Sequence, residues 1–125
     1  MAEKNVYLLM IKDKTVDIVS LDTYRQFANS DETELALLIK ETIRSLEYFQ
    51  DTLKEAFDNA DYARMKASSH SVASELFYLK ATNLKSLLKI FLATEENAIK
   101  NTEGLFQILS ELEDVLQYLK QNIKS

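Results

Sequence analysis

The sequence predicts an all-α protein, an antiparallel up-and-down four-helix bundle with a short N-terminal capping segment. Three observations support this prediction. The chain has no proline and a single glycine, Gly104, and these are the residues that most often mark turns between elements. Four segments carry apolar residues at the spacing of one helical face. Short polar stretches join these segments, as is typical of antiparallel neighbours in a helical bundle.

Residues 32–57 form the first predicted bundle helix. Asp31 and Glu34 stand at its start, an arrangement typical of a capping pair at a helix N-terminus. Apolar or small residues then recur every three or four positions, which predicts one buried face. These residues are Leu35, Leu38, Ile39, Thr42, Leu46, Phe49, Leu53, Ala56 and Phe57.

The second predicted helix follows a break at Asn59 and Asp61, and Asn59 is its candidate N-cap residue. Its inward stripe advances by alternating steps of three and four residues, the period of an amphipathic helix. The stripe consists of Tyr62, Met65, Ser69, Val72, Leu76 and Leu79.

Two further helices complete the predicted bundle. Asn83 caps or interrupts the chain before the third helix, whose apolar residues are Leu84, Leu87, Leu88 and Phe91. Residues 95–101 are polar and are expected to form a loop or a frayed turn. The last helix has a single apolar face, made of Leu105, Ile108, Leu109, Leu112, Val115, Leu116, Leu119 and Ile123.

The first thirty residues contain two short apolar runs, VYLLMI and VDIV, whose composition is strand-like. After them, Leu21, Tyr24 and Phe27 have the spacing of a short helix. We expect this helix to pack across one end of the bundle, as the capping segment of the predicted fold.

Length and charge limit the classes of function. The 125 residues suit one domain, 1–125, built around one core. The formal net charge is -5, and the basic residues are dispersed among acids, whereas a nucleic-acid-binding surface is normally basic. The sequence therefore predicts no nucleic-acid partner. A closed bundle with a polar exterior needs no second chain, so we expect a monomer.

Cysteine content and hydropathy bear on location. The chain has no cysteine, which suits a reducing compartment and leaves no thiol for zinc binding or nucleophilic catalysis. The run VYLLMI is followed at once by charged residues and is too short to cross a bilayer or to serve as a secretion signal. We therefore expect a cytoplasmic protein with no membrane partner.

His70 is the only histidine and lies within the second predicted helix. Each helical residue turns the side-chain direction by roughly 100°, which places the stripe through Met65, Val72 and Leu76 about 180–240° from His70. The imidazole is therefore expected to face solvent from the middle of the helix. The residues within about 60° of it on this face are Ala63, Lys66, Ala67, Ala73, Ser74 and Phe77.

This face combines three features that a partner protein can use. Four of its six residues are alanine or serine, so the walls around the imidazole are low. Lys66 lies one turn before His70 and can stabilise an anion placed on the ring. Phe77 lies two turns after His70, where an exposed aromatic ring can anchor a docking partner. The simpler reading is that His70 is an ordinary surface histidine on a face rich in good helix formers.

These residues resemble the histidine-containing phosphotransfer (HPt) domain family, over about residues 15–122. In that family the histidine is followed by a leucine position, a lysine, a glycine and a later leucine. Here His70 is followed by Val72 at the leucine position, Ser74 at the glycine position and Leu79 at the later leucine. Other positions similar to the family are the acidic-aromatic pair Asp61-Tyr62, the apolar Leu84, Leu87 and Phe91, and a short first helix over Asp17–Phe27.

The chain departs from the family pattern at three places. Ala73 stands where the family has a lysine that steadies the phosphoryl group, and Lys80 stands where it has a glycine. Phe91 and Leu92 replace the usual leucine-glutamate pair of the next helix. Lys66 is the candidate to replace the missing lysine, because it lies about one turn from His70 on the same face.

The resemblance implies a phosphorelay carrier of two-component signalling rather than an autonomous enzyme. His70 would accept a phosphoryl group from the aspartate of a receiver domain and pass it to a second receiver. A hybrid sensor kinase is a further expected partner. The docking face would consist of Ala63, Ala67, Ala73, Ser74 and Phe77, with Lys66 as phosphate stabiliser. No cofactor is expected in the chain itself, because the receiver supplies Mg²⁺.

Two alternatives stay open. The first is a non-catalytic helical adaptor, a degenerate HPt domain that docks a receiver or kinase without accepting phosphate, which the alanine at 73 favours. The second is an unrelated helical bundle with an incidental histidine. Other chemistries fit poorly, because the chain has no glycine-rich phosphate loop, no Glu-x-x-His pair for a di-metal site and no third group to orient a serine-histidine pair. Glu95, Glu96, Glu111 and Glu113 are interpreted as solvated surface.

Overall fold

The computed structural model describes residues 19–123. VYLLMI and the first three residues of VDIV lie outside this range. Every regular element within it is a helix, which confirms the all-α class. The helices are α2 (Asp22–Phe27), α3 (Glu32–Asp58), α4 (Tyr62–Ser71), α5 (Ala73–Tyr78), α6 (Thr82–Phe91), α7 (Glu95–Lys100) and α8 (Thr102–Gln121).

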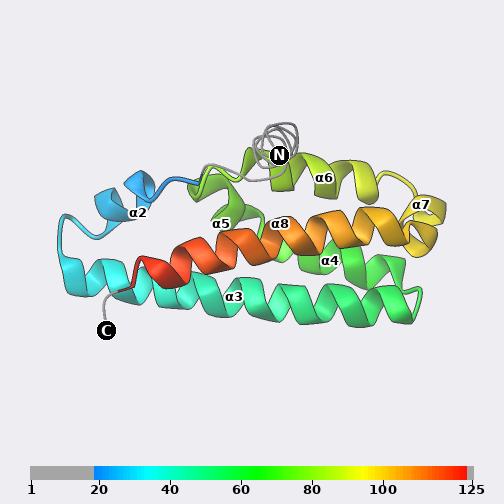
Figure 1. Cartoon of the computed structure of the whole chain (residues 1–125), viewed down its shortest axis with the longest axis horizontal. Coiled ribbons are helices and arrows are strands. Elements are labelled where there is room, and N and C mark those ends of the chain that lie inside the picture. Colours follow the sequence, from blue (N-terminus) through cyan, green and yellow to red (C-terminus); the bar gives the residue numbers. More distant parts are fainter. Residues whose placement is uncertain (1–18, 124–125) are drawn as a thin grey trace, which may run out of the picture.

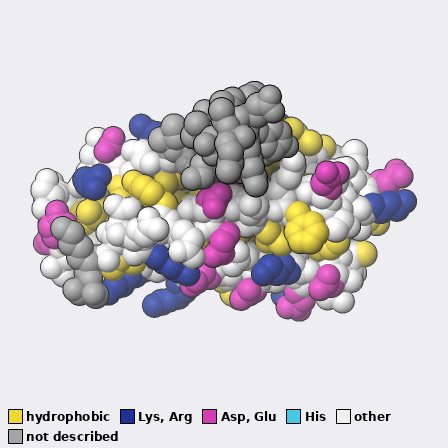
Figure 2. All heavy atoms as spheres, viewed as in Figure 1, with side chains coloured by type: hydrophobic (Ala, Val, Ile, Leu, Met, Phe, Trp, Pro, Cys, Tyr) yellow, Lys and Arg dark blue, Asp and Glu magenta, His cyan; other side chains and the backbone are white. Residues whose placement is uncertain are grey.

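The two longest helices, α3 and α8, lie side by side (Figure 1). α3 also packs against α2 and α4, while α6 packs against α8 and α5. Acidic and basic side chains are interspersed over the face drawn in Figure 2. This agrees with the dispersed charge of the sequence.

The predicted apolar stripes form one buried cluster, to which all the long helices contribute. Leu46, Leu53, Met65 and Leu112 are fully buried at its centre. Thr42, predicted on the inner face of α3, is buried and shares a 2.8 Å hydrogen bond with the hydroxyl of Tyr24. That bond ties α2 to α3.

The second predicted helix is broken at Val72 into α4 and α5, which the stripe of apolar residues did not reveal. Ser71 donates its hydroxyl to the carbonyl oxygen of Ser68 at 2.6 Å. That oxygen is the acceptor that the Val72 N–H would use in a continuous helix. The Val72 N–H instead reaches Ser69 O at 3.3 Å. Local serine bonding of this kind competes with the helical ladder, and it accompanies the break at Val72.

The prediction of a loop at residues 95–101 was wrong, because Glu95–Lys100 forms α7. The hydroxyl of Thr94 accepts a hydrogen bond from the Asn97 N–H at 3.1 Å and caps the helix. Ala98 is fully buried. A six-residue helix with one small buried residue leaves almost no periodic signal in a sequence.

The predicted N-cap of α3 is confirmed, whereas the predicted N-cap of α4 was wrong. Asp31 accepts hydrogen bonds from the N–H groups of Thr33 and Glu34, at 2.9 and 3.1 Å. Asn59 is not the N-cap of the next helix but the C-cap of α3. Asp61 caps α4 instead, accepting from the Arg64 N–H at 3.1 Å.

Two polar residues of the later helices also differ from expectation. Asn83 neither caps nor interrupts the chain, because it lies inside α6, which begins after Ala81. Glu111, interpreted from the sequence as solvated, is only 2% exposed. The two meet in a hydrogen bond of 2.9 Å from Asn83 Nδ2 to Glu111 Oε1. This contact joins α6 to α8 inside the protein.

Candidate functional site

His70 is exposed, as the helical phase predicted. Met65, Val72 and Leu76 are all buried on the opposite side. Its position along the helix differs from the prediction, however. Because α4 ends at Ser71, His70 lies in the last turn of the helix and not in its middle.

The five residues of the predicted docking face are all exposed. Ala63 and Ala67 lie on α4 with His70, while Ala73, Ser74 and Phe77 lie beyond the break, on α5. Phe77 has 65% of its surface exposed. The predicted face is therefore accessible but is divided between two short helices.

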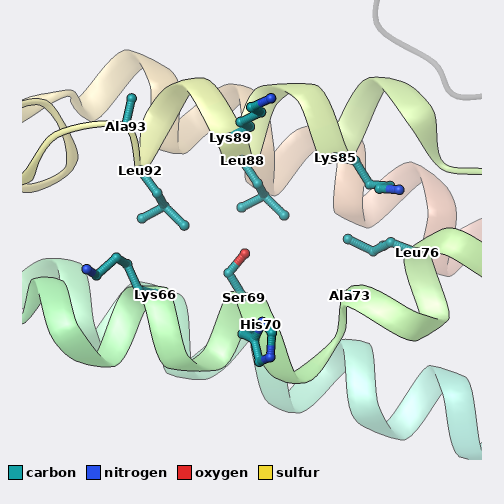
Figure 3. A pocket seen from close by; sticks show the side chains of 10 residues that line it. All are labelled: Lys66, Ser69, His70, Ala73, Leu76, Lys85, Leu88, Lys89, Leu92 and Ala93. Carbon is teal, nitrogen blue, oxygen red and sulfur yellow. The ribbon is translucent and has the colours of Figure 1, made fainter.

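Lys66 is exposed and lies one turn before His70 on α4. Its ammonium Nζ sits over the ring of Tyr62, 4.6 Å from the centroid. The Tyr62 hydroxyl in turn donates to the carbonyl oxygen of Leu92 at 2.7 Å, which fixes the ring in place. In Figure 3 the Lys66 side chain points away from the imidazole. Reaching a group on His70 requires Lys66 to leave this cation–π contact, which is worth about 0.5–1 kcal/mol at an exposed position.

A surface groove of about 490 Å³ opens beside His70, between α4 and α5 on one side and α6 on the other. Leu76, Leu88 and Leu92 form its apolar floor, and the side chains of Leu88 and Leu92 point into it (Figure 3). Lys66 and His70 lie on one rim, Lys85 and Lys89 on the other. We call this feature the lysine groove.

Lys85 and Lys89 were not predicted as site residues. Their spacing of four puts them on one face of α6, but only the packing of α6 shows that this face borders His70. Lys85 Nζ lies over the ring of Phe77, 5.3 Å from its centroid. This contact joins α6 to the predicted docking face of α5.

Among residues 19–123, no carboxylate lines the lysine groove. The nearest acidic residue in sequence, Glu75, borders a separate cavity with Tyr24, Phe27 and Tyr78. Burial raises the pKa of the Glu75 carboxyl, and its Oε2 has no hydrogen-bond partner among the described residues. Within the described part of the chain, the lining of the lysine groove is therefore positively charged.

The site has the parts of a nucleophile and an anion-binding surface. His70 offers an accessible imidazole, and three lysines surround the adjoining groove. Within residues 19–123 there is no cluster of three or more histidine, aspartate or glutamate side chains that could hold a metal ion. None of the helices in that range is both long and apolar enough to cross a membrane.

Comparison with known proteins adds nothing to this geometry. No family model, no curated protein and no solved structure matches the chain.

Proposed function

We propose that this protein is a phosphorelay carrier similar to HPt domains, with His70 as the phospho-acceptor. The observation that carries the proposal is the exposed imidazole of the only histidine, on a face with low walls and beside a groove lined by lysines. An imidazole that must enter another protein's active site needs this access. A structural histidine has no such need.

The backbone at Lys80 supports the resemblance independently. This residue occupies the position at which the HPt pattern has glycine, and its φ is 59°. This is the left-handed region, which favours glycine. The chain thus keeps the backbone conformation that a glycine would serve, although the side chain has changed.

In the proposed reaction, His70 Nε2 attacks the phosphorus of an aspartyl phosphate held by a receiver domain. The N–P bond forms as the P–O bond breaks, and the receiver's carboxylate is the leaving group. Transfer to a second receiver reverses these events on another aspartate. Mg²⁺ belongs to the receiver, while this chain supplies the nucleophile, its orientation and the docking face, in keeping with a reaction governed by positioning and charge neutralisation.

The proposal also includes the bundle topology, the monomeric state and the cytoplasmic location. We assign α3, the broken pair α4–α5, α6 and α8 as the four members of an antiparallel bundle, with α2 as the capping segment and α7 in a connection. The contacts of α3 with α4 and α8, and of α8 with α6, support this assignment. A cytoplasmic monomer is the setting in which we expect it to act.

A receiver-docking adaptor is the second candidate function. Ala73 lacks the ammonium that the family places there, and Lys66 is engaged with Tyr62. An adaptor needs the docking face but no phosphate stabiliser.

Phosphotransfer from a panel of labelled receiver domains separates these two functions. An acid-labile, base-stable label on the chain identifies a phosphohistidine carrier. Receiver binding with no label identifies the adaptor.

Changing Lys66 to alanine should slow phosphotransfer by about twofold at most. Two unit charges 4 Å apart in water interact by about 1 kcal/mol. Lys66 must leave its contact with Tyr62, which costs about 0.5–1 kcal/mol, and the remainder of about 0.5 kcal/mol or less corresponds to a factor of about two in rate. Rates are measured under single-turnover conditions with a labelled receiver. Lys40→Ala, which removes an exposed lysine of α3 away from the groove, should leave the rate unchanged. An equal rate for both variants would remove Lys66 from the proposed site.

Changing Lys80 to glycine should stabilise the fold by about 0.5–1 kcal/mol. A left-handed backbone costs a residue with a side chain roughly 1–2 kcal/mol, part of which is offset because glycine gains freedom in the unfolded chain. Urea unfolding measures the difference. The control, Thr82→Gly, removes a side chain at the first position of α6, outside the left-handed region, and should destabilise. If Lys80→Gly destabilises as well, the glycine-like backbone no longer supports the resemblance.

A further inference from the structure

The two rims of the lysine groove have matching spacing. Lys66 and His70 are four residues apart on α4, and Lys85 and Lys89 are four residues apart on α6. Residues at this spacing lie on one face of a helix, about 5–6 Å apart. Each rim therefore offers two cationic or titratable groups one helical turn apart, and the two rims face each other across an apolar floor.

The groove lysines form no ion pair with the carboxylates that the structure describes. Within residues 19–123 the ion pairs involve Arg25, Arg64, Lys100 and Lys120, and none involves a groove lysine. The whole chain has 20 acidic and 15 basic residues, so carboxylates are not scarce. Among the described residues, three lysines and no carboxylate line this groove, so its local charge is positive although the net charge of the chain is negative.

Aromatic rings support two of these lysines at opposite rims. Lys66 Nζ lies 4.6 Å from the centroid of Tyr62, and Lys85 Nζ lies 5.3 Å from the centroid of Phe77. Such contacts are weak at exposed positions, so an incoming carboxylate can replace them.

The groove floor requires an apolar face in whatever occupies it. Leu76 and Leu88 are almost fully buried, and Leu92 is half-buried. A matching ligand has a hydrophobic stripe flanked on both sides by negative charge repeated every turn. An amphipathic helix with aspartate or glutamate beside its apolar stripe has this pattern, because its own residues at i and i+4 repeat at the same spacing as the rims.

We propose that the lysine groove docks an acidic amphipathic helix of the partner protein, with the helix seated between α4–α5 and α6. This inference deepens the proposed function and rests on it in one respect, namely that the partner carrying the helix is the phosphoryl donor or acceptor. The charged rims accelerate and orient encounter with an acidic partner. Docking there holds the partner's reactive group next to His70.

The binding test uses the whole chain and two synthetic helices. One peptide carries a leucine stripe flanked by glutamates, and its control carries lysines in place of the glutamates. Titration followed by backbone NMR should show saturable binding of the glutamate peptide, with shifts on α4, α5 and α6. Raising the salt from 50 to 500 mM should weaken this binding at least tenfold, since screening acts on exposed charges. No binding, or equal binding of both peptides, overturns the proposal.

Charge reversal tests the role of the rim on α6. The double variant Lys85→Glu and Lys89→Glu should bind the glutamate peptide at least tenfold more weakly than wild type and the lysine peptide more tightly. The control pair Lys40→Glu and Lys54→Glu changes the net charge equally at exposed positions of α3 outside the groove, and should change neither affinity by more than twofold. If both pairs behave alike, general attraction rather than the groove governs binding.

Phosphoramidate separates this inference from the proposed function. This small donor transfers its phosphoryl group to histidine with loss of ammonia and needs no docking. The double variant at Lys85 and Lys89 should lose far less of its labelling rate with phosphoramidate than with a receiver, which should label it at least tenfold more slowly than wild type. Absence of label on wild type from either donor rejects the proposed function, while the peptide titration still decides the docking groove. Equal receiver rates for wild type and the double variant reject the groove alone.

Discussion

Replacing His70 by glutamine should abolish phosphoryl acceptance and leave the fold intact. His70 is the only histidine, so no second imidazole can take over, and glutamine has no nucleophilic nitrogen of comparable strength. The side chain is exposed, and a substitution away from the core usually changes stability by no more than about 0.5 kcal/mol. The measurement is the acid-labile label gained from a phosphorylated receiver, together with the free energy of unfolding in urea.

A matched variant rules out the neighbouring hydroxyl. Ser71 lies beside His70 and is exposed, and Ser71→Ala removes the only other exposed nucleophile in the last turn of α4. This variant should keep the label. Label that survives in His70→Gln but disappears in Ser71→Ala would transfer the role to the serine and end the resemblance to HPt chemistry. A large loss of stability in His70→Gln would contradict the exposed position instead.

The core could be predicted because it obeys a simple rule. The stripe through Leu46, Phe49 and Leu53 and the stripe through Met65 and Leu76 are buried as expected, since helical periodicity depends only on spacing along the chain. The break at Val72 appears as a change of one backbone hydrogen bond, because the Val72 N–H reaches Ser69 O at 3.3 Å. The spacing of apolar residues does not reveal a change in a single hydrogen bond.

The residues of the candidate site likewise fall into those that spacing along the chain predicts and those that it does not. The exposure of His70 and Phe77 follows from the phase of one helix and was predictable. Lys85 and Lys89 were not, because their relation to His70 arises only when α6 packs beside α4 and α5. The orientation of Lys66 toward Tyr62 was also invisible, although a lysine and a tyrosine four residues apart on a helix are a recognisable pair. Spacing along the chain thus identifies residues that share one face of a helix. A groove forms between helices that pack together, so spacing does not identify it.

Two adjacent residues of α5 provide the sharpest test of how the site is supported. Leu76→Ala should destabilise the fold by about 2–5 kcal/mol, because Leu76 is only 2% exposed and its loss opens a cavity beneath the lysine groove. Phe77→Ala removes a larger side chain but should cost less than about 1 kcal/mol. Phe77 is 65% exposed, and the ring contacts that it gives up among the described residues are those with Tyr78 and Lys85.

On partner binding the order of the two effects should be reversed, with Phe77→Ala having the larger effect. Phe77→Ala should weaken receiver docking at least tenfold, since an exposed aromatic beside the acceptor is the type of residue that dominates interface energies. Urea unfolding and receiver titration of both variants measure the two effects. Equal stability losses would mean that the α5 helix is rotated from its assigned phase, and then the face through Ala73, Ser74 and Phe77 is not the docking face. A neutral effect of Phe77→Ala on docking, with Leu76→Ala behaving as expected, would keep the fold and confine docking to the lysine groove.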